Sequence, residues 1–484
     1  QINDMTALAG LVALQELNLS YNALSNITPL SSLVNLKQLY LGNNIITTIT
    51  PVSGLIGLTK LDFGDHVETP LGWNNEINDI TALSGLTNLT WLNINCNQVS
   101  NLTTLSGLSG LTELYLYTNK ITDISPLVGL TGLTILELGS DVDLPEGTAN
   151  QISDITPLAG LTALTHLGLA NNAIGDITPL ASLTNLNLLH LHKNNITDIS
   201  TVSGLTGLET LFLGTNQIID ITPLSGLTGL TLLHVGGNQV NTILPLQNLT
   251  GLKELYLMSN QISDISPLSS LTNLTLLHLG DNQIEDSTPL SGLIHLTQLT
   301  LHENQLVDIT PLSGLVNLTE LHLFTNQIVD VSPLASLTNL TLLNINSNEI
   351  VNLSSLSGLT KLTYLHLGSN LVISISALSG MVNLTELYLH DNQITEISSL
   401  SGATGLETLN LWNNQIEELS ALESLTNLSW LHLGNNSIVD IAPLVANVGL
   451  ASGDYVCLYN NPLGVTAIDT HIPALQSRGV SVDY

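Results

Sequence analysis

The apolar positions of the chain follow one pattern that repeats along most of its length. In residues 252–271, LKELYLMSNQISDISPLSSL, leucine or isoleucine occupies seven regularly placed positions. Neither the 3.6-residue period of a helix nor the 2-residue period of a strand fits them all. A coil fits them, because Leu255 and Leu257 alternate as in a short strand. Asn260 then turns the chain, and we expect Ser266 to be the N-cap of a short helical turn.

An asparagine marks the same place in every copy of this pattern. It stands at positions 22, 44, 75, 97, 119, 150, 172, 194, 216, 238, 260, 282, 304, 326, 348, 370, 392, 414, 436 and 461, which makes 20 copies. Sixteen of the nineteen steps are 22 residues, two are 31 and the last is 25. Because one coil cannot bury its apolar side chains alone, we expect the copies to stack into one array.

The consensus LxxLxLxxNxIxDIxPLxxL resembles the 22-residue leucine-rich repeat of bacterial internalins. It is also similar to the repeat of the leucine-rich regulatory subunit of type-one protein phosphatase. The resemblance implies an α/β solenoid: a leucine-rich-repeat horseshoe of about 20 coils, with a parallel β-sheet on the concave face and short 3₁₀ turns on the convex face. We expect this solenoid to cover residues 1–463, with 9-residue insertions near 64–74 and 139–149.

The last residues of the chain depart from the repeat. In residues 464–484, Ile468, Ile472 and Leu475 have the spacing of a helix, and Gly479 is typical of a helix stop. We expect this segment to be a C-terminal cap that closes the open end of the core.

Histidines and aromatic residues gather at a few positions of the repeat. Because side chains of a strand alternate between two faces, the positions two, four and six residues before the repeat asparagine should lie on the concave face. Ten of the 13 histidines occupy them. We predict that these residues bind a partner: Tyr115, Tyr117, His190, His192, Phe212, His234, Tyr256, His278, His322, Phe324, His366, Tyr388, His390, Trp412, Trp430 and His432. The alternative is that such residues merely suit a solvated parallel strand.

Four leucines strengthen the binding interpretation. Leu188, Leu232, Leu276 and Leu342 fall at the sixth position before the asparagine, where we expect an exposed side chain. With the aromatic positions, they place the predicted partner site on the middle coils, about residues 188–392.

His190 and His192 stand one residue apart, a spacing that could allow both imidazoles to bind one zinc ion. Histidines of one column recur on every second coil, so they would be about 9.5 Å apart, too far to share an ion. No third ligand accompanies the pair, and we expect neither a metal nor another cofactor.

A second column, four residues after the asparagine, is acidic. It contains Asp79, Asp123, Asp154, Asp176, Asp198, Asp220, Asp264, Asp286, Asp308, Asp330, Glu396, Glu418 and Asp440, with Asp4 in the same phase. We expect these acids to accept hydrogen bonds from nearby backbone N–H groups. The alternative is a ladder of carboxylates bridged by calcium.

The two insertions are related, because FGDHVETPLGWNN (63–75) aligns with LGSDVDLPEGTAN (138–150). Both follow a strand, so they should project from one rim. We predict that His66, Trp73, Asp141 and Asp143 contact a ligand there, the alternative being tolerated surface loops.

Composition restricts the partner. Of 484 residues, 7 are Lys or Arg and 39 are Asp or Glu, so the net charge of −32 favours a basic or neutral protein and disfavours nucleic acid. No apolar stretch is long enough to cross a bilayer, and we expect no membrane insertion. We also expect the chain to be a monomer.

The chain has two cysteines, Cys96 and Cys457. A pair this sparse forms neither a disulfide framework nor a metal cluster. We expect the two not to be bonded to each other.

Enzyme motifs are missing, since the chain has no phosphate loop, nucleophile elbow or His-Glu-x-x-His helix. We therefore predict a non-enzymatic, bacterial, protein-recognition scaffold that is extracellular or on the cell surface. The alternative is a structural spacer or surface-array component with no specific ligand.

Two positions of the core carry a smaller residue than the equivalent positions of other copies. Ser287 stands where the repeat has Ile, and Ala403 stands where it has Leu. We predict that the side chains at both sites do not fill the space available to them.

Overall fold

The computed structural model describes residues 1–65, 74–140 and 149–484. The chain forms two compact units, Gln1–Val240 and Asn241–Tyr484. Each is a stack of coils with one short strand and, in most coils, one 3₁₀ turn.

The described residues of the first unit form ten strands of three residues each. They are β1 (Glu16–Asn18), β2 (Gln38–Tyr40), β3 (Lys60–Asp62), β4 (Trp91–Asn93), β5 (Glu113–Tyr115), β6 (Ile135–Glu137), β7 (His166–Gly168), β8 (Leu188–His190), β9 (Thr210–Phe212) and β10 (Leu232–His234). Its 3₁₀ turns are η1 (Thr6–Leu8), η2 (Thr28–Ser32), η3 (Thr50–Val52), η4 (Thr81–Leu83), η5 (Thr103–Gly107), η6 (Ser125–Leu127), η7 (Thr156–Leu158), η8 (Thr178–Ser182), η9 (Ser200–Gly204) and η10 (Thr222–Gly226).

The second unit contains eleven strands of the same length. They are β11 (Glu254–Tyr256), β12 (Leu276–His278), β13 (Gln298–Thr300), β14 (Glu320–His322), β15 (Leu342–Asn344), β16 (Tyr364–His366), β17 (Glu386–Tyr388), β18 (Thr408–Asn410), β19 (Trp430–His432), β20 (Tyr455–Cys457) and β21 (Ser481–Asp483). Its 3₁₀ turns are η11 (Leu244–Leu246), η12 (Ser266–Ser270), η13 (Thr288–Leu290), η14 (Thr310–Gly314), η15 (Ser332–Ser336), η16 (Ser354–Gly358), η17 (Ser376–Gly380), η18 (Ser398–Gly402) and η19 (Ser420–Ser424).

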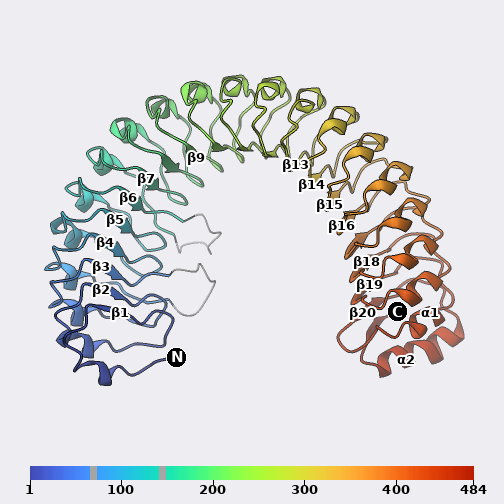
Figure 1. Cartoon of the computed structure of the whole chain (residues 1–484), viewed down its shortest axis with the longest axis horizontal. Helices are drawn as coiled ribbons and strands as arrows, with labels where there is room; N and C mark the ends of the chain where they lie inside the picture. Colours follow the sequence, from blue (N-terminus) through green and yellow to red (C-terminus); the bar gives the residue numbers. More distant parts are fainter. Residues whose placement is uncertain (66–73, 141–148) are drawn as a thin grey trace. The chain divides into compact units, whose positions relative to one another are not determined.

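Within each unit, every strand pairs in parallel with the next strand along the chain. The register is the same throughout, so equivalent residues of successive coils lie opposite each other, as Leu277 and Leu299 do. Figure 1 shows the strands on the inner, concave side of each unit and the turns on its outer side. The sheet and the 3₁₀ turns that the repeat predicts are confirmed.

The core of each unit lies between its strands and its turns. The middle residue of nearly every strand and the residue just after the strand are buried, as Leu277 and Leu279 are. Leucine and isoleucine of the turns close the core from the other side, so one coil buries its apolar face only against its neighbours.

The repeat asparagine joins adjacent coils. Asn304 Nδ2 donates to the carbonyl oxygen of Leu279 in the preceding coil at 3.0 Å and to that of Leu301 at 3.1 Å. Its Oδ1 accepts the N–H of Ile284 at 2.9 Å. The side chain is 8% exposed, so it satisfies backbone groups that water does not reach.

The turns begin differently from the prediction. Ser266 is the first residue of η12, and the N-cap position belongs to Ile265, whose side chain cannot accept a hydrogen bond. Asp264 performs the capping instead, because its Oδ1 accepts the Ser266 N–H at 2.8 Å. The prediction of Ser266 as N-cap is therefore wrong by one residue.

The C-terminal segment contains α1 (Ala442–Ala446), a π-helical turn η20 (Ala467–His471), α2 (Ile472–Ser477) and the last strand β21. Ile472 and Leu475 are buried, and Gly479 ends α2 with a φ of +89°, which favours glycine. Arg478 donates from its guanidinium to the carbonyl oxygens of Val445 and Asn447, at 2.6 and 3.0 Å. These bonds join α2 to the end of α1.

Cys96 is half-buried, Cys457 is buried, and no disulfide joins the two. This agrees with the expectation that they are not bonded to each other. Among the described residues, no helix is both long and apolar enough to cross a membrane.

Candidate functional site

The predicted concave residues all lie where the strand pattern places them. We use the name concave face for three positions of each coil: the first and third residues of the strand and the second residue after it. In β12, for example, Leu276 and His278 flank the buried Leu277. The sixteen predicted partner-binding residues are half-buried, and so are Leu188, Leu232, Leu276 and Leu342. We predicted that these leucines are exposed, but neighbouring side chains of the sheet, only about 4.8 Å apart, cover part of each.

In the first unit, rings on nearby coils pack against one another. His190 stacks on Phe212 of the next coil with ring centroids 4.3 Å apart, and His192 meets His234, two coils further along the chain, edge-on at 5.5 Å. His190 and His192 thus contact different neighbours, although they stand one residue apart. Tyr115 packs against Trp91 at 5.6 Å, and Tyr117 lies half-buried on the same face.

The second unit repeats this arrangement over more coils. His302 stacks on Phe324 at 4.3 Å with the planes 11° apart, and Tyr256 meets His278 edge-on at 5.0 Å. Tyr388 lies 5.0 Å from His366.

Near the C-terminus, Trp430 packs on Tyr455 at 6.2 Å and on His432 at 5.6 Å, and Trp412 lies 6.4 Å from His432. The structure therefore brings neighbouring pairs of predicted residues together within each unit. That these residues bind a partner remains a prediction.

Four glutamates lie on the concave face, and sequence reasoning missed them. Each stands two residues before a predicted ring on the same strand: Glu113, Glu254, Glu320 and Glu386. The Oη atoms of Tyr115, Tyr256 and Tyr388 donate to their glutamates at 3.0, 3.2 and 2.8 Å, and His322 Nε2 lies 2.8 Å from Glu320 Oε1. The signal was present in the sequence as a recurring Glu-Leu-Tyr or Glu-Leu-His triplet. These glutamates bring acceptor groups into a surface that also contains rings and leucines.

Burial changes the protonation of several rings on this face. It lowers the pKa of His278, His302 and His432, and it lowers the pKa of His366 to about 4, with His390 as a second cause. Burial and the hydrogen bond to Glu386 raise the pKa of Tyr388. The four histidines are therefore neutral at pH 7, and we expect these four to gain charge only at a lower pH than an exposed imidazole would.

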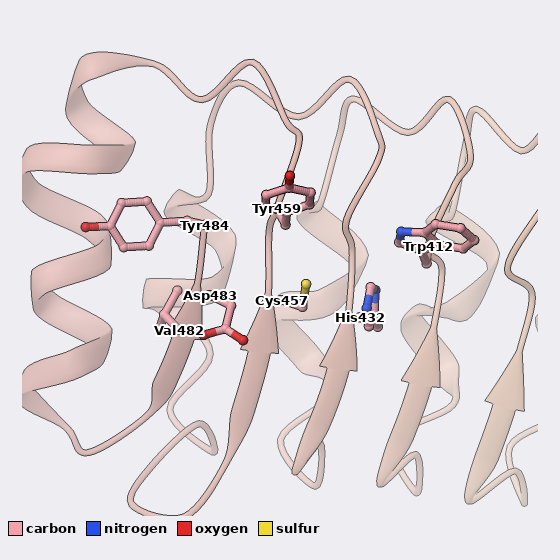
Figure 2. A pocket seen from close by; sticks show the side chains of 7 residues that line it. All are labelled: Trp412, His432, Cys457, Tyr459, Val482, Asp483 and Tyr484. Carbon is pink, nitrogen blue, oxygen red and sulfur yellow. The ribbon is translucent and has the colours of Figure 1, made fainter.

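A hollow of about 570 Å³ lies at the end of the concave face of the second unit (Figure 2). It is lined by Trp412, His432, Cys457, Tyr459, Val482, Asp483 and Tyr484. His432, Cys457 and Asp483 are register partners on β19, β20 and β21. They do not form a metal centre, since no group of three or more His, Cys, Asp or Glu side chains in residues 1–65, 74–140 and 149–484 can hold a metal ion. Asp483 instead accepts a hydrogen bond from Tyr455 Oη at 2.8 Å.

The acidic column has the local role that we expected. Twelve of its aspartates accept the backbone N–H of the residue two positions later, at 2.8 to 2.9 Å. Hydrogen bonds from Thr222, for example, lower the pKa of Asp220. Eleven of these carboxylates lie at the start of a 3₁₀ turn and Asp440 lies at the start of α1, whereas Glu396 accepts the Ser398 hydroxyl.

The predicted ligand contacts of the insertions cannot be placed. His66, Trp73, Asp141 and Asp143 lie outside the described residues.

The family model for leucine-rich repeats (two copies) matches most of the repeat array. It matches residues 12–55, 184–226, 228–270, 250–292, 272–314, 294–336, 360–402, 382–424 and 404–446. The chain belongs to the leucine-rich-repeat family. A search of curated proteins finds no match.

Among solved structures, the chain is similar to an internalin, InlF, from Listeria monocytogenes. The two are 37% identical over 66% of this chain and 86% of that chain, with a TM-score of 0.54. This similarity confirms the internalin-like, bacterial character that the repeat consensus suggests.

More distant structures share the fold. A plant peptide hormone receptor, RGFR1, solved in complex with RGF2, is 18% identical over 99% of this chain and 87% of that chain, with a TM-score of 0.69. A leucine-rich-repeat protein of Leptospira interrogans, LIC12759, is 21% identical over 99% of this chain and 97% of that chain, with a TM-score of 0.50.

Proposed function

We propose that the chain is a non-enzymatic recognition protein and that the concave face of Asn241–Tyr484 binds a protein or peptide partner. The observation that carries this proposal is the packing of rings from coil to coil, of which the His302–Phe324 stack is the tightest in this unit. Large aromatic side chains at the centre of an interface supply much of its binding energy.

The packing of these rings favours binding in a second way. Tyr256, Phe324 and Tyr388 are half-buried against their neighbours before any partner arrives. Their side chains therefore lose little conformational entropy on binding, which is the main cost of using flexible side chains in an interface. RGFR1, which shares the fold, was solved with a bound ligand, RGF2, and this coarse class of function is the one we assign.

The charge of the chain indicates the kind of partner. Glu254, Glu320 and Glu386 lie on the same face as the rings, and the whole chain has a net charge of −32. We infer a basic or neutral partner, because an acidic protein or a nucleic acid would be repelled. The similarity to an internalin supports an extracellular or cell-surface location for a monomeric chain.

The experiment compares two triple variants. In the first, Tyr256, Phe324 and Tyr388 are replaced by Ala. In the matched control, Ile294, Val316 and Val382 are replaced by Ala, since these apolar side chains are 44 to 53% exposed and lie between a turn and the next strand. Circular dichroism and thermal unfolding verify that both variants are folded. The immobilised wild-type chain is first used to capture and identify a partner from a culture or host-cell extract.

The expected loss of binding follows from the free energy that such aromatic side chains contribute to an interface. Each truncation at the centre of an interface costs about 1 to 4 kcal/mol, so the first variant should lose capture of the identified partner and the control should retain it. The proposal fails if the first variant captures this partner at full strength. Failure of the wild-type chain to bind any partner saturably would favour the structural spacer.

The first unit is tested separately. A separate set of Ala variants replaces the predicted partner-binding residues of this unit: Tyr115, Tyr117, His190, His192, Phe212 and His234. Deletion of residues 66–73 and 141–148 tests the predicted contacts of the insertions. Loss of capture in these deletions alone would place the site at the insertions and contradict the proposal for the second unit.

A further inference from the structure

Two imidazoles of neighbouring coils converge on the concave face of the second unit. His366 is the third residue of β16, and His390 is the second residue after β17. Their Nε2 atoms lie 3.1 Å apart, and their ring centroids are separated by 5.3 Å. Both side chains are half-buried.

The orientation of His390 is fixed from the other side of its ring. Nδ1 of His390 lies 2.9 Å from Oδ2 of Asp391. A carboxylate only accepts hydrogen bonds, so Nδ1 bears the proton and the lone pair of a neutral ring is on Nε2. Oδ1 of Asp391 in turn accepts a hydrogen bond from Asn413 Nδ2 at 2.7 Å. The lone pair of His390 is thereby directed at His366.

A glycine provides the space for this arrangement. A Cβ atom added to Gly368 would lie 2.5 Å from Nε2 of His390, which is closer than real Cβ contacts allow. The ring of His390 therefore lies over the backbone of the preceding coil, beside His366, only because residue 368 has no side chain.

We propose that His366 and His390 form an open binding site for a divalent cation of the Zn²⁺, Ni²⁺ or Cu²⁺ class, with the Nε2 atom of each ring as a ligand. Imidazole suits these ions, whereas Ca²⁺ and Mg²⁺ prefer oxygen. With metal–nitrogen bonds of about 2.0 to 2.1 Å, an N–N separation like the one observed subtends roughly 98° at the metal, between the square and tetrahedral angles.

The site also has a carboxylate beside one of its rings, as metal-binding histidines usually do. Asp391 contacts Nδ1 of His390, and such a carboxylate fixes the orientation and the tautomer of a metal-binding histidine. In the metal-free pair, Nε2–H of His366 donates to His390. On binding, this proton moves to Nδ1 of His366, and the ring changes tautomer without a net loss of a proton. Water or a group of a partner completes the coordination.

Isothermal titration of the full chain, stripped with a chelator and dialysed, measures the site directly with ZnCl₂ and with CuCl₂. We expect one ion per chain at micromolar affinity. Changing His366→Gln or His390→Gln should weaken binding at least tenfold, and Asp391→Asn should weaken it about 10-fold to 100-fold. His295→Gln is the control, because His295 is exposed and lies outside the concave face. Its affinity should stay within about twofold of the wild type.

Electron paramagnetic resonance of the Cu²⁺-loaded wild-type chain gives a readout that does not depend on any variant. We expect coupling to two imidazole nitrogens. A signal from oxygen ligands alone would overturn the proposal. So would displacement of Zn²⁺ by excess Ca²⁺, which would show that carboxylates hold the ion, or unchanged titration of the His366→Gln/His390→Gln double variant.

Discussion

Ala403 interrupts a column of large apolar side chains in the second unit. The equivalent residues of the flanking coils are Met381 and Leu425, and both are fully buried. Ala403 itself is 3% exposed, so water scarcely reaches the place that a larger side chain would occupy. We predict that Ala403→Leu stabilises the unit.

The magnitude follows from three added carbon atoms. Burying them contributes roughly 2.4 kcal/mol at about 0.8 kcal/mol each. Ordering the leucine side chain costs about 0.5 to 1 kcal/mol, which leaves a net gain of about 1 to 2 kcal/mol. For a unit of this size, the midpoint of thermal unfolding should rise by about 2 to 8 °C.

The assay is thermal and urea unfolding of the full chain, followed by circular dichroism. Met381→Leu is the control, because it conserves side-chain volume and should change the midpoint little. An unchanged or lower midpoint for Ala403→Leu would refute the reasoning, since it would show that Met381, whose side chain is flexible, already fills the space.

Ser287 occupies a similar break but has a different environment. It is 1% exposed, and its Oγ donates to the carbonyl oxygen of Asp308 at 3.1 Å. Ser287→Ile removes this bond, at a cost of about 1 kcal/mol, while it buries a larger apolar side chain. Its gain should therefore be smaller than that of Ala403→Leu, and an equal or larger gain would contradict this account.

Three further predictions concern side chains with defined partners. Asn304→Ala should lower the free energy of unfolding by about 2 to 4 kcal/mol in urea titrations, because buried carbonyl and N–H groups of two coils lose their partner. Asp264→Ala should cost about 0.5 kcal/mol and Asp264→Asn less, since asparagine keeps the oxygen that caps the turn; equal losses would exclude the capping role. Burial lowers the pKa of His302, so its contribution to stability is complete above pH 6.5 and is lost as the pH falls through the lowered pKa. His302→Gln should accordingly flatten the decline of the urea midpoint between pH 7 and pH 4, and a parallel decline would refute this assignment.

The repeat determines the fold so completely that the sequence predicts it well. A 22-residue spacing of Leu, Asn and Ile leaves one way to bury seven apolar residues per coil, and the structure has that arrangement. The start of the turn was misjudged because serine is a good N-cap by composition, whereas the acid two residues earlier has the better geometry.

The side-chain contacts of the concave face were harder to predict. Within one column, histidines recur on every second coil and are too far apart to meet. The contact between His366 and His390 joins two different columns on adjacent coils and depends on a glycine, Gly368, in the space between them. The partners of Glu254 and Glu386 were missed for the same reason, because spacing along the chain shows which side chains share a face but not how each one bends toward its neighbours.

The half-burial of the concave rings changes what a partner would encounter. Rings that stood free in solvent would offer both faces, but His302 and Phe324 cover each other, and His366 is covered in part by Tyr388. A partner on this surface therefore meets ring edges, imidazole nitrogens and glutamate oxygens held in fixed positions. Such a surface selects partners by the placement of polar groups more than by apolar area. This is consistent with a recognition role for a chain whose scaffold repeats, while the side chains on its concave face differ from coil to coil.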